Sequence, residues 1–334
     1  MQSGIVAGVF RLTLTVVFAL GAIVAPSALA ADVTIAPDPA AQEVAALDGT
    51  VVWVSGEFGS QALMETSDAG ARRVVGAPTA TAYRSINLGR NRRGALVLTY
   101  LRCTTAARCT PYRDDLRGHR ARMNGLTLAR CSLSTAPALW ATRAAYGLDC
   151  HTGHPKVFDA RRSGLYVKTG AGGPRRLPLP KDAVNSGSML IDSVDLRGTR
   201  VAAVAADIAE YAFSETVTGA RTRSFLAALS EGDSDEHVRG LSLGTGNALW
   251  ALVDAEHAGD PNQAIIHRLR GGCRDFETLS NPPGPDQESG FRATGLAVDG
   301  QTVYLVVPGT GIVTHRFAPG HSCTRSAAMV AGRG

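Results

Sequence analysis

The sequence has little lysine, few aromatic residues and no long hydrophobic run beyond its first thirty residues. Only three of its 34 basic residues are Lys, and aromatic residues make up 6% of the 334 positions. We interpret the excess of Arg first as a bias of the coding genome, and only weakly as a sign of a surface that binds phosphate. The hydrophobic fraction of 45% and charged fraction of 19% exclude a disordered or collagen-like chain.

Short motifs of catalysis are also missing. The sequence has no phosphate-binding loop, His-Glu-x-x-His or dinucleotide fingerprint. The segments 244–246 and 309–311 both read Gly-Thr-Gly, but each lacks a third glycine at the needed spacing. We therefore predict that both are turns, and we expect no cofactor.

The first thirty residues are typical of a secretory signal. Arg11 precedes an apolar core from Leu12 to Ala25, and the small residues Ala28 and Ala30 then occupy the −3 and −1 positions of a cleavage site. An uncleaved membrane anchor is the alternative, but Pro26 ends the core below the ~20 residues that a span requires. We expect cleavage after Ala30 and export of a soluble, monomeric chain with no membrane span.

Six cysteines follow the signal segment, and an even number in an oxidising compartment favours three disulfides. Two of them flank a short segment between apolar runs, so we place them across the mouth of a β-hairpin. The other bonds are assigned to the nearest remaining partners, which gives Cys103–Cys109, Cys131–Cys150 and Cys273–Cys323. A metal site is disfavoured because no Cys-x2-Cys pair occurs, and the cluster of Cys150, His151 and His154 would need a further ligand.

Apolar runs recur along the chain at intervals of about 50 residues, which indicates an internal repeat. Most of them follow a glycine turn, at Gly94, Gly198, Gly246 or Gly300. The runs cover residues 51–54, 95–100, 138–146, 201–204, 248–253 and 303–307.

Short strands with frequent turns and a repeat of this length predict four-stranded units. About six such units make an all-β fold, a single β-propeller over residues 31–330, with seven blades as the alternative. We place the unit starts near residues 50, 86, 135, 190, 240 and 290. Residues 201–212 are rich in Ala, yet we favour strand over helix there, whereas residues 39–47 are predicted to form a short helix before the first blade.

Two histidines occupy matching places in this repeat. Each lies in an apolar-x-His-Arg-apolar segment followed by a glycine turn and a cysteine, at His267 and at His315. We predict that both lie at equivalent blade edges with their rings bonded to neighbouring backbone. Catalysis by either one is the less favoured interpretation.

The segment Leu165-Tyr-Val-Lys-Thr, followed by Arg175-Arg-Leu-Pro178, resembles secreted bacterial TolB-like, WD40-like propeller repeats. The resemblance covers residues 50–325. The Ser-Pro-Asp-Gly turn of that family is absent, and 195–199 and 298–302 are its nearest relatives here. The resemblance implies a non-enzymatic, extracytoplasmic interaction platform. The N-terminal α/β domain of TolB has no counterpart, so the Tol–Pal partnership is not carried over.

Acidic and basic clusters were weighed as sites. Asp233, Asp235 and Glu236 could hold a hard cation, but the glycine and distal Glu of an EF-hand loop are missing, so a solvated acidic loop is favoured. Arginines also cluster near expected turns without interleaved aromatics, so we predict solvated charges and no nucleic-acid partner. These arginines are Arg90, Arg92, Arg93, Arg117, Arg120, Arg122, Arg161 and Arg162.

Two classes of function remain open. The favoured one is a secreted binding or scaffold propeller whose partner is a protein or a component of the cell envelope. The alternative is an extracytoplasmic hydrolase or lyase with its site at the channel mouth, since a propeller can bring residues from different blades to its axis. His, Asp or Glu side chains from three blades converging on one point would favour the enzyme. The three tryptophans are expected in the core.

Overall fold

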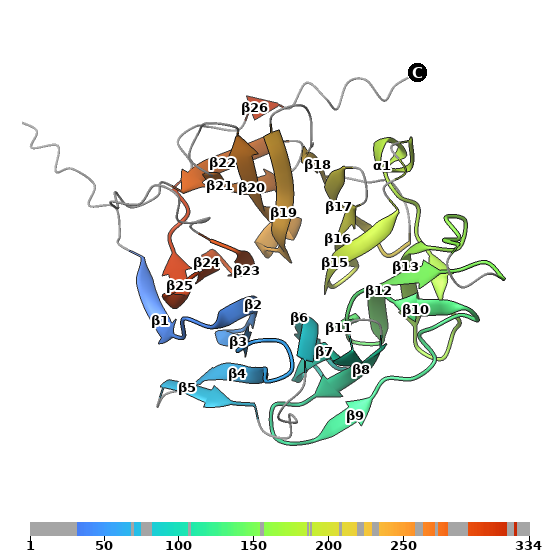
Figure 1. Ribbon diagram of the computed structural model, residues 1–334, viewed down its shortest axis with the longest axis horizontal. Coiled ribbons are helices and arrows are strands. Elements are labelled where there is room, and N and C mark those ends of the chain that lie inside the picture. The colour runs from blue at the N-terminus through green and yellow to red at the C-terminus, as the bar shows by residue number, and fades with distance from the viewer. Residues whose placement is uncertain are drawn as a thin grey trace, which may run out of the picture. The chain divides into compact units, whose positions relative to one another are not determined.

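The computed structural model describes residues 32–67, 70–74, 82–105, 108–153, 157–185, 187, 189–206, 209–218, 224–228, 234–257, 263–270, 273–279, 293–318 and 324–325. All of them belong to one compact unit, Asp32–Gly334. This part of the chain is almost entirely strand; its helices are α1 (Lys181–Asn185) and a 3-10 turn, η1 (Thr245–Asn247). The predicted all-β propeller is confirmed (Figure 1). No helix in the described part is long and apolar enough to cross a membrane.

The sheets lie around a common axis, and each extends outward from it (Figure 1). One sheet contains β2 (Ala41–Leu47), β3 (Thr50–Ser55), β4 (Ala62–Ser67) and β5 (Gly70–Arg73). Another contains β15 (Leu190–Arg197), β16 (Arg200–Ala206), β17 (Glu210–Thr216) and β18 (Ser224–Ala228). A third contains β19 (Ser234–Leu243), β20 (Leu249–His257), β21 (Gln263–Arg270), β22 (Cys273–Leu279) and β26 (Thr324–Arg325).

A nine-stranded sheet combines two such units. Its first half contains β6 (Ala82–Arg90), β7 (Leu96–Thr105), β8 (Arg108–Asp114) and β9 (Arg120–Arg122). Its second half contains β10 (Cys131–Leu133), β11 (Ala138–Trp140), β12 (Arg143–Cys150), β13 (Gly164–Thr169) and β14 (Arg175–Arg176). The halves meet through one parallel pair, Trp140 with Arg90. Counted separately, the two halves bring the radial units formed by the described residues to six.

The last sheet joins the two ends of the propeller chain. Its inner strands are β23 (Gly295–Asp299), β24 (Thr302–Val307) and β25 (Gly311–His315), and its outer strand is β1 (Val33–Pro37). β1 pairs antiparallel with β25, from Val33 opposite Thr314 to Pro37 opposite Gly311. The ring is therefore closed by strand pairing between the two ends, which removes an exposed sheet edge.

The predicted apolar runs are mostly the second strands of the sheets, β3, β7, β16, β20 and β24, and the run at 138–146 covers β11 and the start of β12. Second strands are covered on both faces, as β16 shows, where all seven residues are buried. A strand buried on both faces reads as a continuous apolar run. The turn glycines before these strands are also as predicted, with φ of 79° at Gly94 and 61° at Gly198, a region that favours glycine.

One predicted element is wrong. Residues 39–47 were predicted to form a short helix, but residues 41–47 form β2, the innermost strand of its sheet. Ala, Gln and Glu do favour helix locally. Tertiary packing overrides that preference, because β2 pairs with β3 and buries Ala45, Ala46 and Leu47. The strand prediction for 201–212 is confirmed by β16 and β17.

Two of the predicted disulfides are present. Cys103–Cys109 spans the hairpin of β7 and β8, and Cys131–Cys150 joins β10 to β12. Cys273 is also disulfide-bonded, but its predicted partner Cys323 lies outside the described residues. The core lies between neighbouring sheets and includes the fully covered Trp53 and Trp250, as predicted. Trp140 is only partly buried, with the Arg90 guanidinium 6.0 Å from the centre of its ring.

Candidate functional site

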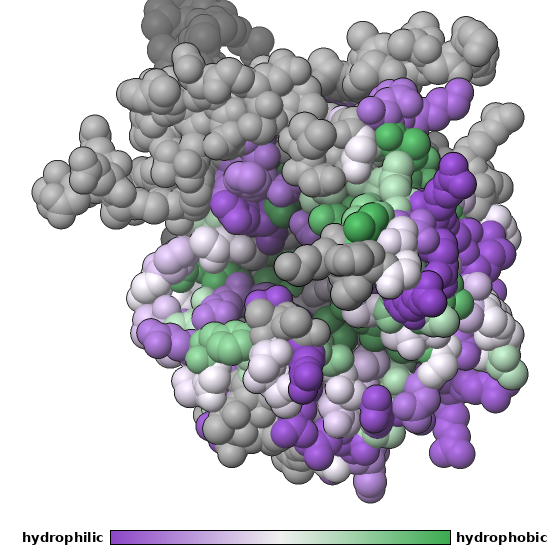
Figure 2. All heavy atoms as spheres, turned by 45° about the vertical axis from the view of Figure 1, so that its right-hand side comes forward, coloured by the Kyte–Doolittle hydropathy of each residue, from purple (hydrophilic) through white to green (hydrophobic). Residues whose placement is uncertain are grey.

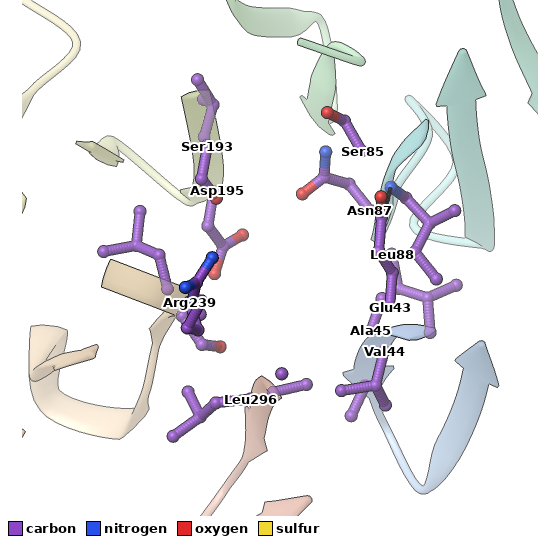
Figure 3. Close-up of a pocket in the computed structure, with 18 of the residues that line it drawn as sticks. Glu43, Val44, Ala45, Ser85, Asn87, Leu88, Ser193, Asp195, Arg239 and Leu296 are labelled. Carbon is purple, nitrogen blue, oxygen red and sulfur yellow. Dashed lines mark hydrogen bonds between the residues drawn. The ribbon is translucent and has the colours of Figure 1, made fainter. Parts of the chain in front are cut away.

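A cavity of about 210 Å³ lies on the axis of the propeller. Its lining comes from five strands near the axis, β2, β6, β15, β19 and β23. Figure 3 shows Glu43, Ser85 and Asn87 on one wall and Asp195 and Arg239 on the facing wall. The lining contains carboxylates, arginines, amides and hydroxyls but no histidine among the described residues.

Four of these five strands carry a β-bulge where they line the cavity. The register shifts in β2, β6, β15 and β19 relative to the second strand of each sheet. The residues left between paired positions are Gln42, Glu43, Ser85, Ile86, Asp192 and Arg239, and all of them line the cavity. A bulge re-aims side chains and is frequent beside functional sites. Ser85 in addition has φ of 51°, an uncommon value for a residue other than glycine.

Glu43 joins two neighbouring sheets at this level. Its Oε2 accepts a hydrogen bond from the backbone N–H of Ile86 at 3.0 Å. Burial raises the pKa of this carboxyl, against the lowering effect of the backbone N–H groups of Ile86 and Ser85. A carboxylate engaged in this way by backbone serves first as a link between β2 and β6.

Asp192 is the other acid among the bulge residues. Although the side chain of Asp192 is exposed in the cavity, desolvation by the surrounding walls, followed by the negative charges of Glu210 and Asp149, raises its pKa to about 6. Glu210 itself accepts from the backbone N–H of Val238 at 2.5 Å and contacts His237 Nδ1 at 3.1 Å. The negative charges that act on Asp192 are therefore those of Glu210 and Asp149.

The bulge residue Arg239 is also engaged. Its guanidinium forms an ion pair with Asp254, a fully buried carboxylate on β20. The buried charge is thereby neutralised, which offsets much of its desolvation cost. Burial nevertheless raises the pKa of Asp254, with Arg239 opposing that effect.

Polar contacts between neighbouring innermost strands repeat around the axis. Asp195 Oδ2 accepts from the backbone N–H of Leu243 at 2.7 Å, and Ser242 Oγ accepts from the N–H of Val298 at 3.2 Å. Ser242 directly precedes Leu243, so β19 donates a bond to β15 and accepts one from β23. Farther round, Asp299 Oδ2 accepts from the N–H of Gly49 at 2.6 Å. Polar side chains at these levels fasten blade to blade.

Arg197 lies across the axis where the innermost strands end. Its Nη2 donates to the carbonyl oxygens of Ala46 on β2 and Val298 on β23, at 3.1 and 2.6 Å. Its Nε lies 3.7 Å from Asp195 Oδ2, and the side chain is 16% exposed. One guanidinium thus connects three sheets and obstructs the channel at this end.

The residues singled out for metal binding are not brought together within the described chain. Asp233 lies outside the described residues, and Asp235 pairs with Glu256 along β19 and β20. Glu236 is half-buried, and its negative charge acts on Arg274. Residues 234–236 open a strand, where an acidic loop was expected. No group of three His, Cys, Asp or Glu side chains in the described part is arranged to hold a metal ion.

His267 and His315 do lie in equivalent third strands, β21 and β25, as predicted, but these strands are not blade edges, because β22 and β1 pair outside them. Their expected bonding to backbone is wrong, because side chains surround both rings. The Arg274 Nε donates to His267 Nδ1 at 3.2 Å, and burial together with the Arg274 charge lowers the pKa of His267 to about 3. His315 lies between Asp32, at 2.8 Å, and Glu277, at 3.2 Å. Both histidines hold strands together.

Sequence reasoning missed every residue of the cavity lining. The sequence did contain one signal for these strands. Each strand that lines the cavity is followed, after a short turn, by one of the apolar runs. The bulges hid it, since an extra residue breaks the alternation by which a strand is recognised.

No family model matches this chain. No curated protein matches it. Among solved structures, it is similar to a protein of unknown function from Dyadobacter fermentans, with 10% identity, a TM-score of 0.52 and coverage of 85% of this chain and 96% of that one. It is also similar to BamB from Moraxella catarrhalis, with 14% identity, a TM-score of 0.39 and coverage of 83% and 85%. It is also similar to the Dos1 propeller, with 10% identity, a TM-score of 0.41 and coverage of 84% of this chain and 69% of that one. The likeness to the Dyadobacter protein shows a shared fold.

Proposed function

We propose that this protein is an extracytoplasmic binding module without catalytic activity, exported by cleavage of residues 1–30. Disulfides in the fold are consistent with an oxidising compartment. The resemblance of residues 50–325 to TolB-like repeats supports the same role of an interaction platform.

The observation that carries the proposal is the bridge of Arg197 to Ala46 and Val298. With that end of the channel obstructed, the axial cavity is a pocket that is entered from the end where the innermost strands begin. Bulges place polar groups such as Ser85 and Asp192 near that end. A concave pocket with a few convergent polar groups is the usual form of a ligand site.

The volume of the pocket indicates what enters it. About 210 Å³ lies below the ~300–1,000 Å³ of pockets that enclose drug-sized ligands. The pocket therefore suits one side chain or one sugar unit of a larger molecule. We infer that the partner is a protein or a cell-envelope component that inserts such a group and rests on the surrounding rim.

An enzyme at the channel mouth is the second candidate, and the pKa of Asp192 near 6 favours it, since general acid–base groups have such values. Against it, Glu43 and Asp195 are engaged by the backbone N–H groups of neighbouring blades. No described histidine joins them in the lining.

A pocket-filling variant tests the proposal. Ser193→Trp places an indole in the cavity, and Thr199→Trp places one in the exposed turn after the same strand as the matched control. The probes are soluble peptidoglycan fragments, disaccharides and short peptides, with binding followed by thermal shift and by NMR line broadening. We expect at least one probe to bind the parent and Thr199→Trp proteins but not Ser193→Trp.

Binding that is unaffected by Ser193→Trp would move the site away from the axis and refute the proposal. Turnover of a probe that is abolished by Asp192→Asn, with binding retained, would establish the enzyme instead.

A further inference from the structure

A second hollow, which we call the basic groove, lies between the two halves of the nine-stranded sheet. Its volume is about 700 Å³, and it shares no lining residue with the axial pocket. Turns and strand ends of β6–β9 and β11–β14 bring six cationic side chains to it. They are Arg92, Arg93, Arg113, Arg122, Arg143 and Lys168. Figure 2 turns the side bearing β10, β12 and β13 forward and shows many hydrophilic side chains on that side of the molecule.

No carboxylate lines the basic groove, and none of its six cations takes part in an ion pair with a described residue. The neighbouring acids do not line the groove. Asp114 is fully buried, and Asp115 accepts hydrogen bonds from the backbone N–H groups of Arg117 and His119. Six like charges that converge without neutralisation repel one another. A bound anion would relieve that repulsion.

Two of the cations are held in place by backbone. Lys168 Nζ donates to the carbonyl oxygen of Gly125 at 2.9 Å, and Arg143 Nη1 donates to that of Gly198 at 3.3 Å. Neither contact removes positive charge from the groove. Arg92, Arg93, Arg113 and Arg122 are exposed, and their guanidinium groups are accessible to a ligand.

The floor of the groove is apolar and includes the buried residues Val97, Leu126 and Ala144. A cleft lined by one sign of charge over low-dielectric walls focuses the field and concentrates counter-ions. No aromatic side chain lines the groove, so it has no platform for stacking bases. Recognition would therefore depend on charge and hydrogen bonds.

We propose that the basic groove binds an extended ligand, other than a nucleic acid, that carries several tetrahedral oxyanions, either phosphate or sulfate groups. Five of the six cations are Arg, whose planar fork of donors suits such groups. A terminal phosphate or a sulfate monoester presents three strong acceptor oxygens for one centre of charge, whereas a carboxylate presents two. The volume holds several such units. The site is independent of the axial pocket and does not rest on the function proposed for it.

The test removes three exposed groove charges and compares them with three exposed charges elsewhere. The groove variant is Arg92→Ser, Arg93→Ser and Arg122→Ser, and the control, with the same net charge, is Arg73→Ser, Arg108→Ser and Arg117→Ser. Labelled polyphosphate, heparin, poly-glutamate and duplex DNA are titrated into each protein at 50 and 200 mM salt. Circular dichroism checks that both variants fold.

We expect polyphosphate or heparin to bind the parent protein and to lose at least tenfold in affinity in the groove variant but less than twofold in the control. The preferred one of the two identifies phosphate or sulfate as the natural group. The salt dependence should also decrease in the groove variant, because fewer counter-ions are released. Equal losses in both variants, or binding of none of the probes, would overturn the site. Equal or tighter binding of poly-glutamate or DNA would overturn the ligand class.

Discussion

The guanidinium of Arg197 donates to the carbonyl oxygen of Val298 at 2.6 Å, from a sheet on another side of the axis. The same nitrogen also donates to Ala46, so three sheets share one cationic donor. Such a bond has two consequences. It fixes the spacing of the blades, and it sets which end of the channel is obstructed.

Replacing Arg197 should therefore weaken the whole ring. Because hydrogen bonds to charged groups contribute about 1.5–3 kcal/mol, we expect Arg197→Met to lower the free energy of unfolding by roughly that amount. Urea denaturation measures the change, with the exposed Arg117→Met as the control. An unchanged midpoint for Arg197→Met would show that the bridge is not formed in solution.

The stability of the protein should also depend on pH through Glu215. This carboxyl is fully buried, and burial raises its pKa to about 7, with Arg175 opposing the shift. Its folded pKa lies above the unfolded value of about 4.5, so the folded state binds the extra proton between the two. Ionising the buried Glu215 carboxyl therefore lowers the free energy of unfolding. This loss of stability is absent below pH 4.5, increases up to pH 7 and is complete above it.

Glu215→Gln removes that penalty while keeping the shape of the neutral acid. We expect the variant to be more stable than the parent by about 1–3 kcal/mol at pH 8 and indistinguishable from it at pH 4.5. Thermal unfolding at both pH values measures this, and the exposed Glu57→Gln should change neither. A gain of the same size at both pH values would contradict the assignment.

Closure by β1 can be tested within one strand. Ala36 is fully buried against β25 and its neighbours, whereas Val33 is 59% exposed. An unpaired charge in the buried position should cost more than about 3 kcal/mol, so we expect Ala36→Asp to lower the melting temperature strongly and to expose β25 to protease. Val33→Ser should have little effect. Similar melting temperatures for the two variants would mean that β1 does not close the ring.

The third disulfide remains a prediction. Cys273 is bonded, and its strand pairs with β26, where it lies opposite Arg325, two residues after Cys323. A bond between them closes a loop of about 50 residues, worth up to roughly 4 kcal/mol in the chain-entropy treatment. We expect non-reducing peptide mapping to find Cys273 joined to Cys323, and Cys273→Ser to expose the C-terminal blade to protease. A link from Cys323 to any other residue would refute the pairing.

Export is tested at the amino terminus. If the segment ending in Ala28-Leu-Ala30 is a cleavage site, the exported protein begins Ala-Asp-Val. N-terminal sequencing decides this. A mature protein that retains Met1 would refute cleavage.

Sequence patterns predicted the parts of the fold that are buried on both faces. After Arg200, β16 reads as Val and Ala without interruption, and we predicted a strand there with a helix as the alternative. β2 reads as a helix, because its identity as a strand depends on β3 and on the axis, neither of which is local. The axial pocket was missed for the same reason: Glu43 and Ile86 are 43 residues apart, and only the radial arrangement of the blades brings them into contact. The basic groove was missed for the same reason, because Arg92 and Lys168 come from different halves of the nine-stranded sheet and line one hollow only in the folded protein.

The pairing of β1 with β25 also imposes an order on folding. Thr314 bonds to the carbonyl of Val33, a residue 281 positions earlier in the chain. A chain delivered from its amino terminus therefore holds its first strand without a partner until nearly all of the propeller has emerged. Pairing at such a separation makes folding slow, and an unpaired edge is open to other chains in the interval. The ring can close only near the end of synthesis, after β25 has emerged. Any shortened product that lacks Gly311–His315 therefore keeps an open sheet edge.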